Sequence, residues 1–395
     1  MRLNMKGMNR DLRIIWQEMK KIFRPIMLIM LVLINLLMYY IFIDFDISYF
    51  ANGRPAKDYY EISSEMIEDY GRKLDEKEYD DFKRAYQEAL DRADAYIQKL
   101  DEAQQTDVAS YAELVELNNK NDLSSPERQL YDKLFSEKEI GWEIQTREGI
   151  MEDMDSAGTD FGYGYISGKP SERQEARIND LLEDESFRSI FPAYPVGDNF
   201  HSISQNICLT ILVSILFMIL PITIRDYKNR MIDLQYTSRA GRKLFIKKAA
   251  AGVLSAFIIA TVLLCVYYGL YFTNNITIFL NSDINSFLGY PYWYNLTFWQ
   301  LMLIVIGLTY ILALSTALCA IFISSISKNY ISVIGLQFPI FACVCLLLTQ
   351  RMLLGNALAI DHPQPQFFFT YGVIIILPAV AILWKKQREQ QRDIL

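Results

Sequence analysis

Long apolar runs alternate with polar stretches along this chain, and the apolar runs are its clearest pattern. Six of them carry no charged side chain, and each is about long enough to cross ~30 Å of hydrocarbon as a helix rising ~1.5 Å per residue. They are Pro25–Ile43, Ile207–Ile224, Ala249–Phe272, Phe298–Ile323, Tyr330–Leu348 and Phe367–Trp384. Backbone groups in lipid need internal hydrogen bonds, which favours helices. The pattern therefore predicts a mostly α, six-span helical membrane protein, because six such helices would be too many for the core of one soluble domain.

The polar stretch between the first two apolar runs has the periodicity of helices. Its apolar residues recur at three- and four-residue spacing, as in Leu74, Phe82, Tyr86, Leu90, Ile97 and Leu100. The sequence Ser125-Pro126-Glu127-Arg128 is typical of a helix start, and that helix is expected to continue through Ile140 towards Met151. Ser171 and Gln174 form a capping-box pattern that starts another helix. We therefore expect a helical domain between spans one and two, with the glycine-rich segment 158–165 at a loop tip.

Charge is divided unevenly between this stretch and the rest of the chain. Residues 44–198 contain 38 of the 46 acidic residues and 18 of the 39 basic ones, a formal charge of −20, whereas the remainder carries +13. Lys and Arg gather before span one, between spans two and three and after span six, and residues 273–297 contain neither. Because basic segments beside spans favour the cytoplasmic side, both termini are expected in the cytoplasm of a plasma-membrane protein, and the acidic domain outside.

These patterns divide the chain into seven parts. Residues 1–24 are expected to form a cytoplasmic amphipathic helix, 25–43 span one, 44–206 the acidic extracytoplasmic domain, 207–224 span two, 225–248 a cytoplasmic segment, 249–384 spans three to six, and 385–395 a basic cytoplasmic tail. All five cysteines fall inside spans. No disulfide framework therefore supports the acidic domain, which is long enough to have its own core.

Aromatic and apolar residues predict contacts with both membrane surfaces. The N-terminal helix has one apolar face, formed by Leu12, Ile15, Trp16, Met19, Ile22 and Phe23, with most of its basic residues off that face. Such a helix lies in the headgroup layer, either as an anchor or as an elbow that moves with the spans. An aromatic cluster before span four is typical of an interfacial belt and comprises Tyr290, Tyr292, Trp293, Tyr294, Phe298 and Trp299.

No motif indicates an enzyme. The two histidines, His201 and His362, lie far apart without metal-ligand spacing, and no Gly-x-Ser-x-Gly nucleophile motif occurs. Gly162 to Lys169 partly matches a phosphate loop, but the spacing is wrong and Pro170 replaces the required Ser or Thr. We therefore expect no catalytic residue, no cofactor and no nucleic-acid partner.

Two other segments of the acidic domain leave alternatives open. Asp153 and Asp155 partly match the start of a calcium loop, but its fifth position is Ala157 and its twelfth is Gly164. A solvated acidic helix end is the preferred interpretation, and no metal site is expected. The aromatic residues among the glycines, Phe161, Tyr163 and Tyr165, are equally compatible with a ligand-contact surface and with a packed loop.

The segment Arg225–Lys248 has the most specific pattern in the chain. A short helix through Met231, Ile232 and Leu234 is followed by a break at Thr237-Ser238, and a second helix starts near Ala240-Gly241 and leads into the small residues Ala249-Ala250-Ala251-Gly252. Here the chain resembles the permease subunits of ABC type-2 exporters. The N-terminal amphipathic helix, the six spans and the large domain between spans one and two also resemble a subset of these permeases from Gram-positive bacteria. Unlike the family pattern, Asp226 opens the segment without a glycine.

The resemblance implies that Arg225–Lys248 is the coupling segment that docks on the ATPase subunit. The residues that it assigns to coupling are Asp226, Arg230, Met231, Ile232, Leu234, Thr237, Ser238, Arg239 and Arg242. No cytoplasmic segment contains a nucleotide-binding motif, so a separate ABC ATPase is implied. Six spans make half of a transporter in this family, so a homodimer or a second permease subunit is expected as well, besides membrane lipid.

Few polar groups interrupt the spans. Gln337 and Pro339 lie in span five, Pro221 in span two and Pro378 in span six. Helix packing explains them, and a substrate path or hinge is the alternative, since proline frees backbone groups that neighbours must satisfy. No charged residue lies within a span, which argues against an ion-coupled transporter.

Two classes of function follow from the sequence. The first is a permease subunit of an ATP-driven exporter for a peptide, an antibiotic or a lipid-like amphiphile. The second is a membrane-anchored sensor or mechanotransmission protein whose acidic ectodomain binds an extracellular ligand, with cationic peptides favoured by long-range attraction. The substrate itself cannot be read from the residues.

Overall fold

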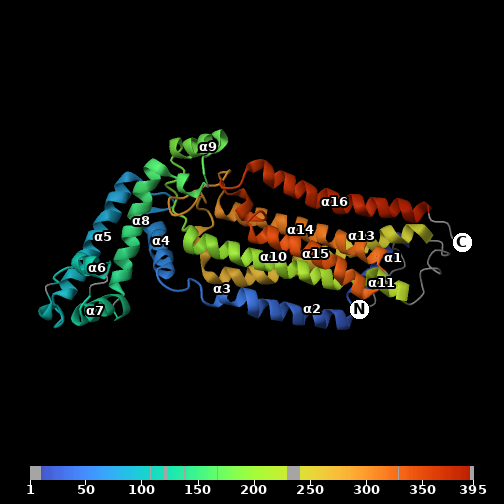
Figure 1. Cartoon of the computed structure of the whole chain (residues 1–395), viewed down its shortest axis with the longest axis horizontal. Coiled ribbons are helices and arrows are strands. Elements are labelled where there is room, and N and C mark those ends of the chain that lie inside the picture. Colours follow the sequence, from blue (N-terminus) through green and yellow to red (C-terminus); the bar gives the residue numbers. More distant parts are fainter. Residues whose placement is uncertain are drawn as a thin grey trace. The chain divides into compact units, whose positions relative to one another are not determined.

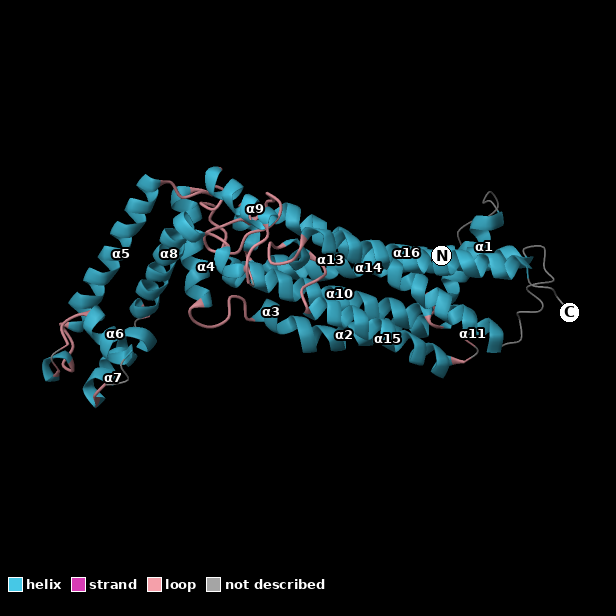
Figure 2. Ribbon diagram, turned by 45° about the horizontal axis from the view of Figure 1, so that its top comes forward, coloured by secondary structure: helices cyan, strands magenta, loops and turns pink. Residues whose placement is uncertain are grey.

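The computed structural model describes residues 10–106, 108–119, 123–137, 139–166, 168–228, 241–327 and 329–391. These residues are mostly helical and form no β-strand; isolated bridges such as Lys73–Ser189 and Asp283–Thr297 are the only extended pairings that they contain. The chain divides into two compact units (Figures 1 and 2). The membrane unit comprises Met1–Ser48, Phe200–Asn274 and Gln300–Leu395, and the acidic unit comprises Tyr49–Asn199 and Asn275–Trp299.

Six helical stretches of the described chain are long and apolar enough to cross a membrane, as the sequence predicts. They are Pro25–Ser48, Ala193–Asp226, Leu244–Asn274, Phe298–Ile326, Tyr330–Thr349 and Gln364–Gln391. The protein is therefore a multi-pass membrane protein. The elements behind these stretches are α2 (Pro25–Met38), η1 (Tyr39–Ile43), α3 (Asp44–Ser48), η5 (Ala193–Gly197), α10 (Asp198–Ile219), α11 (Pro221–Lys228), α13 (Leu244–Tyr271), η7 (Phe272–Asn274), α14 (Phe298–Ile326), α15 (Tyr330–Thr349) and α16 (Gln364–Gln391).

The spans differ in how deeply they are packed. In the most apolar window of the α10 stretch 61% of the residues are buried, whereas the window in the α2 stretch has 6%. The central position of α10 follows from its small and β-branched residues, such as Ser204, Thr210 and Ser214, which let neighbouring helices approach closely. This unit also contains the N-terminal helix α1 (Arg10–Ile22), the turn η6 (Gly241–Lys243) before α13 and a turn before α16.

Three distant parts of the chain meet at one end of the membrane unit. Helix α1 packs against α11 and against α13, and the turn η6 contacts α16. Figure 1 shows α1, α11 and the end of α16 at this same end. The described residues before span one, between spans two and three and after span six therefore gather at one end of the membrane unit.

A short connection before α16 is also buried. The turn η9 (Gly355–Leu358) follows span five, and its neighbours Leu353, Leu354 and Ile360 are buried with it. Among the described residues the segment forms one 3₁₀ turn.

The acidic unit is built from helices around two apolar cores. Its elements are α4 (Ala56–Tyr70), α5 (Glu76–Ile97), η2 (Ala103–Gln105), α6 (Tyr111–Asn119), α7 (Ser125–Asp132), η3 (Lys133–Glu137), α8 (Ile140–Asp160), η4 (Tyr163–Tyr165), α9 (Glu172–Glu183) and η8 (Ile276–Phe279). Helices α5 and α8 pack side by side and contribute to both cores (Figure 2). One core includes Met66, Phe82 and Leu181, and the other includes Leu114 and Leu130.

Two predicted helix starts of the acidic unit are confirmed by capping boxes, whereas one predicted helix continuation is wrong. The capping box of Ser171 and Gln174 opens α9, and Ser124 and Glu127 form another at the predicted start of α7. The predicted continuation of that helix through Ile140 is wrong. The chain breaks at Glu139, which has a left-handed backbone conformation with φ of 59°, and α8 begins anew at Ile140.

The segment between spans three and four belongs to the acidic unit. The Phe287 N–H donates to the Phe187 carbonyl at 2.6 Å, and the Ala193 N–H donates to the Leu288 carbonyl at 3.0 Å. The sequence predicts that Tyr292 belongs to an interfacial aromatic belt. Its side chain is instead only 3% exposed and is packed within the acidic unit. The segments Tyr49–Asn199 and Asn275–Trp299 share one folded unit and are therefore expected on the same side of the membrane.

Candidate functional site

A cluster of buried charges joins α1 to the helices on either side of the predicted coupling segment. The Nζ of Lys248 on α13 lies 2.5 Å from the Oδ2 of Asp226 on α11, and Lys21 on α1 lies 3.7 Å from the other oxygen of Asp226. Lys21 also pairs with Glu18 at 2.7 Å. Glu18, Asp226 and Lys248 are each at most 6% exposed. We call these four residues the charge cluster.

The sequence of α1 explains why it docks here. Met19 and Ile22 on its apolar face are buried, whereas Leu12 at its start is 54% exposed. Glu18 lies beside Met19, so burying the apolar face also brings a carboxylate into the contact. Buried charges need partners because the cost of desolvating an isolated one is several kcal/mol. The charge cluster therefore makes the position of α1 depend on α11 and α13.

A second polar contact fixes the bend that leads into α11. Pro221 cannot continue the hydrogen bonding of α10, which ends at Ile219. The hydroxyl of Ser324 on α14 accepts from the Thr223 N–H at 3.3 Å and donates to the Leu220 carbonyl at 3.1 Å. Ser324 thus bonds backbone groups on both sides of Pro221. Helix α11 runs from this bend to the charge cluster.

The predicted coupling residues are only partly within the described structure. Asp226 is described and belongs to the charge cluster, and Arg242 lies in the turn η6. The others lie outside the described residues, and they are Arg230, Met231, Ile232, Leu234, Thr237, Ser238 and Arg239. The predicted helix start near Gly241 is confirmed, since η6 leads directly into α13. The docking role of these residues stays a prediction.

The four polar or proline residues expected in the spans occupy different places. Gln337 is 6% exposed and lines a small cavity between α10, α14 and α15. Pro339 lies inside α15, and Pro378 lies buried inside α16. Pro221 begins α11. Among these four, the structure thus assigns Gln337 to a cavity and Pro221 to a bend.

The sequence reasoning missed a polar contact that holds span one. The side-chain amide of Asn35 on α2 donates to Ser214 Oγ on α10 at 3.0 Å, and the hydroxyl of Tyr267 on α13 donates to Asn35 Oδ1 at 3.0 Å. Helix α2 has no buried residue of its own. Interhelical hydrogen bonds hold membrane helices where apolar packing is thin. The signal in the sequence was the single amide in the apolar run of span one.

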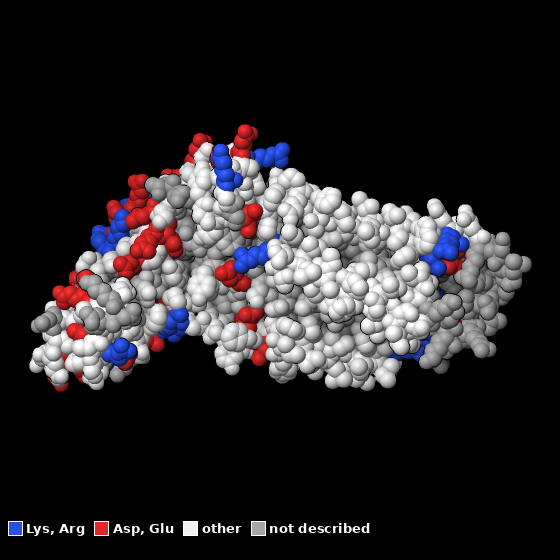
Figure 3. Space-filling view, viewed as in Figure 1, with Lys and Arg blue, Asp and Glu red and all other residues white. Residues whose placement is uncertain are grey.

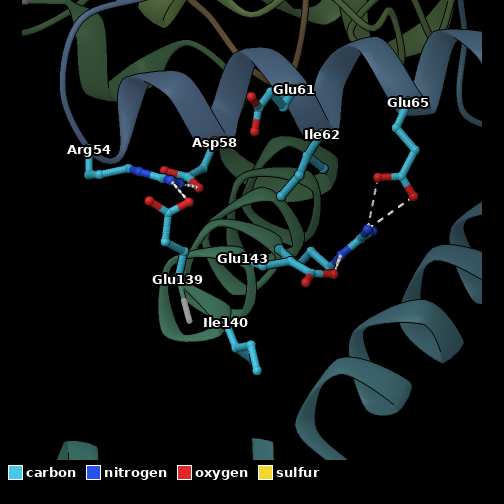
Figure 4. A pocket seen from close by; sticks show the side chains of 9 residues that line it. Arg54, Asp58, Glu61, Ile62, Glu65, Glu139, Ile140 and Glu143 are labelled. Atoms are coloured by element: carbon cyan, nitrogen blue, oxygen red, sulfur yellow. Dashed lines mark hydrogen bonds and ion pairs between the residues drawn. The ribbon is translucent and has the colours of Figure 1, made fainter. Parts of the chain in front are cut away.

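The acidic unit contains a separate pocket of about 390 Å³ between α4 and α8. Figure 4 shows side chains from these two helices facing one another across it. Five carboxylates line it with two arginines, and the lining residues are Arg54, Asp58, Glu61, Ile62, Glu65, Glu139, Ile140, Glu143 and Arg147. We call it the acidic pocket.

The two arginines neutralise only part of the acidic pocket. Arg147 is bonded to Glu65 at 2.9 Å and to Glu143 at 3.2 Å, and Arg54 pairs with Asp58 and Glu139. Burial raises the pKa of Asp58, and the charge of Arg54 partly offsets that rise. The Oδ2 of Asp58 has no hydrogen-bond partner among the described residues. The residual negative charge suits an ammonium or guanidinium group.

Helix α8 contains both aspartates of the calcium-loop match and ends within the glycine-rich segment. Asp153 and Asp155 lie within this helix rather than in a loop, and Asp155 accepts a hydrogen bond from the Tyr79 hydroxyl at 2.8 Å. The described residues contain no group of three His, Cys, Asp or Glu side chains arranged to hold a metal ion. Phe161 is 4% exposed and belongs to the first core, whereas Tyr165 is 52% exposed. The glycine-rich segment is thus packed at Phe161 and open at Tyr165.

The charge distribution over the surface follows the division into units. In Figure 3 acidic side chains gather on the acidic unit over α5, α8 and α9, and the spans of the membrane unit show a largely uncharged surface. Comparison of the chain with models of protein families, with curated proteins and with solved structures gave no match. The functional conclusion therefore depends on the charge cluster, the bend at Pro221 and the acidic pocket.

Proposed function

We propose that this chain is the transmembrane permease subunit of an ATP-driven ABC exporter, with ATP hydrolysed by a separate subunit. The observation that carries the proposal is the buried pair of Asp226 and Lys248, which brackets the predicted coupling segment and includes α1 in one contact. A force applied to that segment would move α11, α13 and α1 together. The bend held by Ser324 passes such a movement to α10 and α14.

The cargo proposed for this permease is a peptide, an antibiotic or a lipid-like amphiphile. The described spans contain few polar groups, among them Gln337 and Asn35. Charged residues lie at the ends of the span stretches, as Asp226 and Lys248 do, rather than along them. Ion-driven transport needs an ionisable relay within the membrane, so energy from ATP suits these spans better. A homodimer or a second permease completes the proposed transporter.

Affinity purification from the native membrane tests the proposal. The tagged chain is expected to co-purify with an ATPase that carries a phosphate-binding loop. Replacing Arg239 and Arg242 by Ala should release that ATPase, because these residues lie in the predicted docking segment. The matched control is Arg388→Ala in α16, which removes a basic residue at the same end of the membrane unit. Absence of any ATPase, or equal recovery from all variants, would refute the proposal.

A second candidate function is supported by the acidic pocket. In this alternative the protein is a membrane-anchored sensor or a mechanotransmission device, and a cationic peptide binds between α4 and α8. The pocket volume of about 390 Å³ falls in the range of ~300–1,000 Å³ usual for ligand sites. Ile62 and Ile140 supply apolar contacts beside the carboxylates.

Binding of a short arginine-rich peptide to the full chain in nanodiscs tests this candidate. Glu61→Gln with Glu65→Gln should weaken binding, and added salt should weaken it further, because the attraction is screened. Asp81→Asn is the control, since Asp81 is an exposed carboxylate of the same unit that pairs with Arg84 outside the pocket. Equal loss in the control variant would show that the acidic surface as a whole attracts the peptide without a specific pocket.

A further inference from the structure

The cavity beside Gln337 leaves one polar group without a partner inside the membrane unit. Gln337 is 6% exposed, and its Nε2 has no hydrogen-bond partner among the described residues. A buried amide without a hydrogen bond costs roughly 1–3 kcal/mol, and the cost is not relieved by lipid. A group that accepts a hydrogen bond from this amide would remove that cost.

The size and lining of the cavity identify the missing acceptor. The cavity has a volume of about 10 Å³, and an internal water needs roughly 10–15 Å³ by this measure. A lipid tail or an amphiphile would not fit. Thr316 and Cys319 on α14 share the lining with Gln337, and the other lining residues are apolar, so a hydroxyl and a thiol are the further polar groups of the lining. A water molecule requires about two to four such partners.

The backbone of α15 is also weakened at this level. Pro339 lies inside the helix and has no N–H for the carbonyl of Gly335, so one hydrogen bond is missing in the turn that contains Gln337. Buried residues of α15 are few and include Val333, Gln337 and Leu348. Gln337 therefore lies on the narrow face by which α15 packs against the bundle, at the turn that proline loosens.

We propose that Gln337, Thr316 and Cys319 hold an internal water molecule between α10, α14 and α15. The water accepts a hydrogen bond from Gln337 Nε2 and donates to the side chains on α14. The helices then meet through a water molecule at this point instead of through apolar side chains alone. Because the water can change its hydrogen-bond partners, α15 can shift at Pro339 while Gln337 Nε2 keeps a hydrogen bond. This inference does not depend on the transport function proposed above.

Hydroxyl-radical footprinting by brief X-ray irradiation tests the proposal on the full chain in nanodiscs. Radicals formed from an internal water modify the nearest side chains, so Phe341, which lines the cavity, should be labelled in the wild type. Phe338 on the same helix is 69% exposed towards the surroundings of the spans and gives the lipid-facing background. Labelling of Phe341 in the wild type no higher than that of Phe338 would overturn the proposal.

A matched variant separates the water from simple looseness of α15. Gln337→Met keeps a side chain of similar length without a donor, and labelling of Phe341 should fall about tenfold, because the water loses a hydrogen-bonding partner. Phe338 should be unchanged. Thr316→Val serves the same purpose if Gln337→Met does not yield folded protein, and should reduce labelling of Phe341 to a smaller extent. Undiminished labelling in the folded variants would also overturn the proposal.

Discussion

At the scale of single residues, the buried pair of Asp226 and Lys248 can be tested directly. A buried charge destabilises a fold unless an opposite charge lies beside it. Their atoms lie 2.5 Å apart, with both side chains below a tenth exposed. Removing one partner leaves the other buried without its nearest opposite charge, whereas removing both leaves an apolar contact beside Lys21 and Glu18. The single variants and the double variant should therefore behave very differently.

We predict that Asp226→Leu and Lys248→Met each lower the free energy of unfolding by about 3–5 kcal/mol, and that the double variant recovers most of the loss. Denaturant unfolding of the purified protein measures this. The exposed pair of Arg84 and Asp81, at 72% and 52% exposure, is the control, and its loss should stay below about 1 kcal/mol. Additive losses in the double variant would show that the two charges are not coupled.

Asp153 provides a test of pH dependence in the acidic unit. The surrounding protein desolvates its carboxyl group and Glu152 repels its charge, which together raise its pKa to about 6. An unfolded Asp has a pKa near ~3.9. The folded state therefore binds this proton more tightly, and the stability that it contributes is complete below pH ~4 and lost as the pH rises through about 6.

Asp153→Asn should accordingly raise the melting temperature of the full chain at pH 7.5, because the variant removes a charge that the fold disfavours. The gain should shrink steadily as the pH falls from 7 to 4. A series of thermal melts across this range measures the effect. A gain that grows towards low pH would mean that the folded state prefers Asp153 ionised.

At the scale of helices, apolar runs and caps could be predicted from the sequence because their causes are local. The six spans and the cap at Ser171 depend on residues within one or two turns of each other. The break at Glu139 could not be predicted, because a left-handed backbone is uncommon for a residue other than glycine and the glutamate itself gives no local signal for it. The partners of Asp226 also escaped prediction, since nothing in the spacing of Lys21 and Lys248 indicates that α1 lies beside α11 and α13.

Close packing between helices is a further property that can be tested at this scale. A Cβ added at Gly252 on α13 would lie 2.6 Å from the Cδ1 of Ile321 on α14, whereas one added at Gly269 on the same helix would meet nothing within 4 Å. Small residues allow such approach between membrane helices. The two glycines therefore form a matched pair.

We predict that Gly252→Leu destabilises the protein by about 1–3 kcal/mol through overpacking, and that Gly269→Leu has no destabilising effect, because it gains helix propensity without a clash. Thermal unfolding of both variants in the same detergent distinguishes them. Equal destabilisation at the two positions would show that the loss does not come from the close contact between α13 and α14.

At the scale of the whole molecule, the contacts within each unit restrict the topology. Helix α1, the turn η6 and the end of α16 belong to one end of the membrane unit, so both described chain ends lie on the same side of the membrane. We predict that span one carries the chain to the other side, where the acidic unit begins. The positive charge before span one predicts that the first side is the cytoplasm.

Accessible-cysteine labelling tests this orientation. In intact cells, Asp101→Cys in the acidic unit should react with a membrane-impermeant maleimide, and Arg388→Cys at the end of α16 should react only after permeabilisation. The unmodified chain is the control, because its described cysteines lie within the spans. Reaction of Arg388→Cys in intact cells would reverse the orientation.

The acidic unit is formed by two segments that lie far apart in the chain, and this affects how it folds during synthesis. Phe287 and Leu288 complete the core that Phe82 and Leu181 begin, yet they leave the ribosome only after spans two and three have been made. The nascent domain must therefore wait, with an incomplete apolar surface, until the second hairpin of spans has been inserted. A chaperone on the side of the membrane that holds the acidic unit would find its substrate in that interval, and a fragment that stops at Asn199 would keep its apolar surface incomplete.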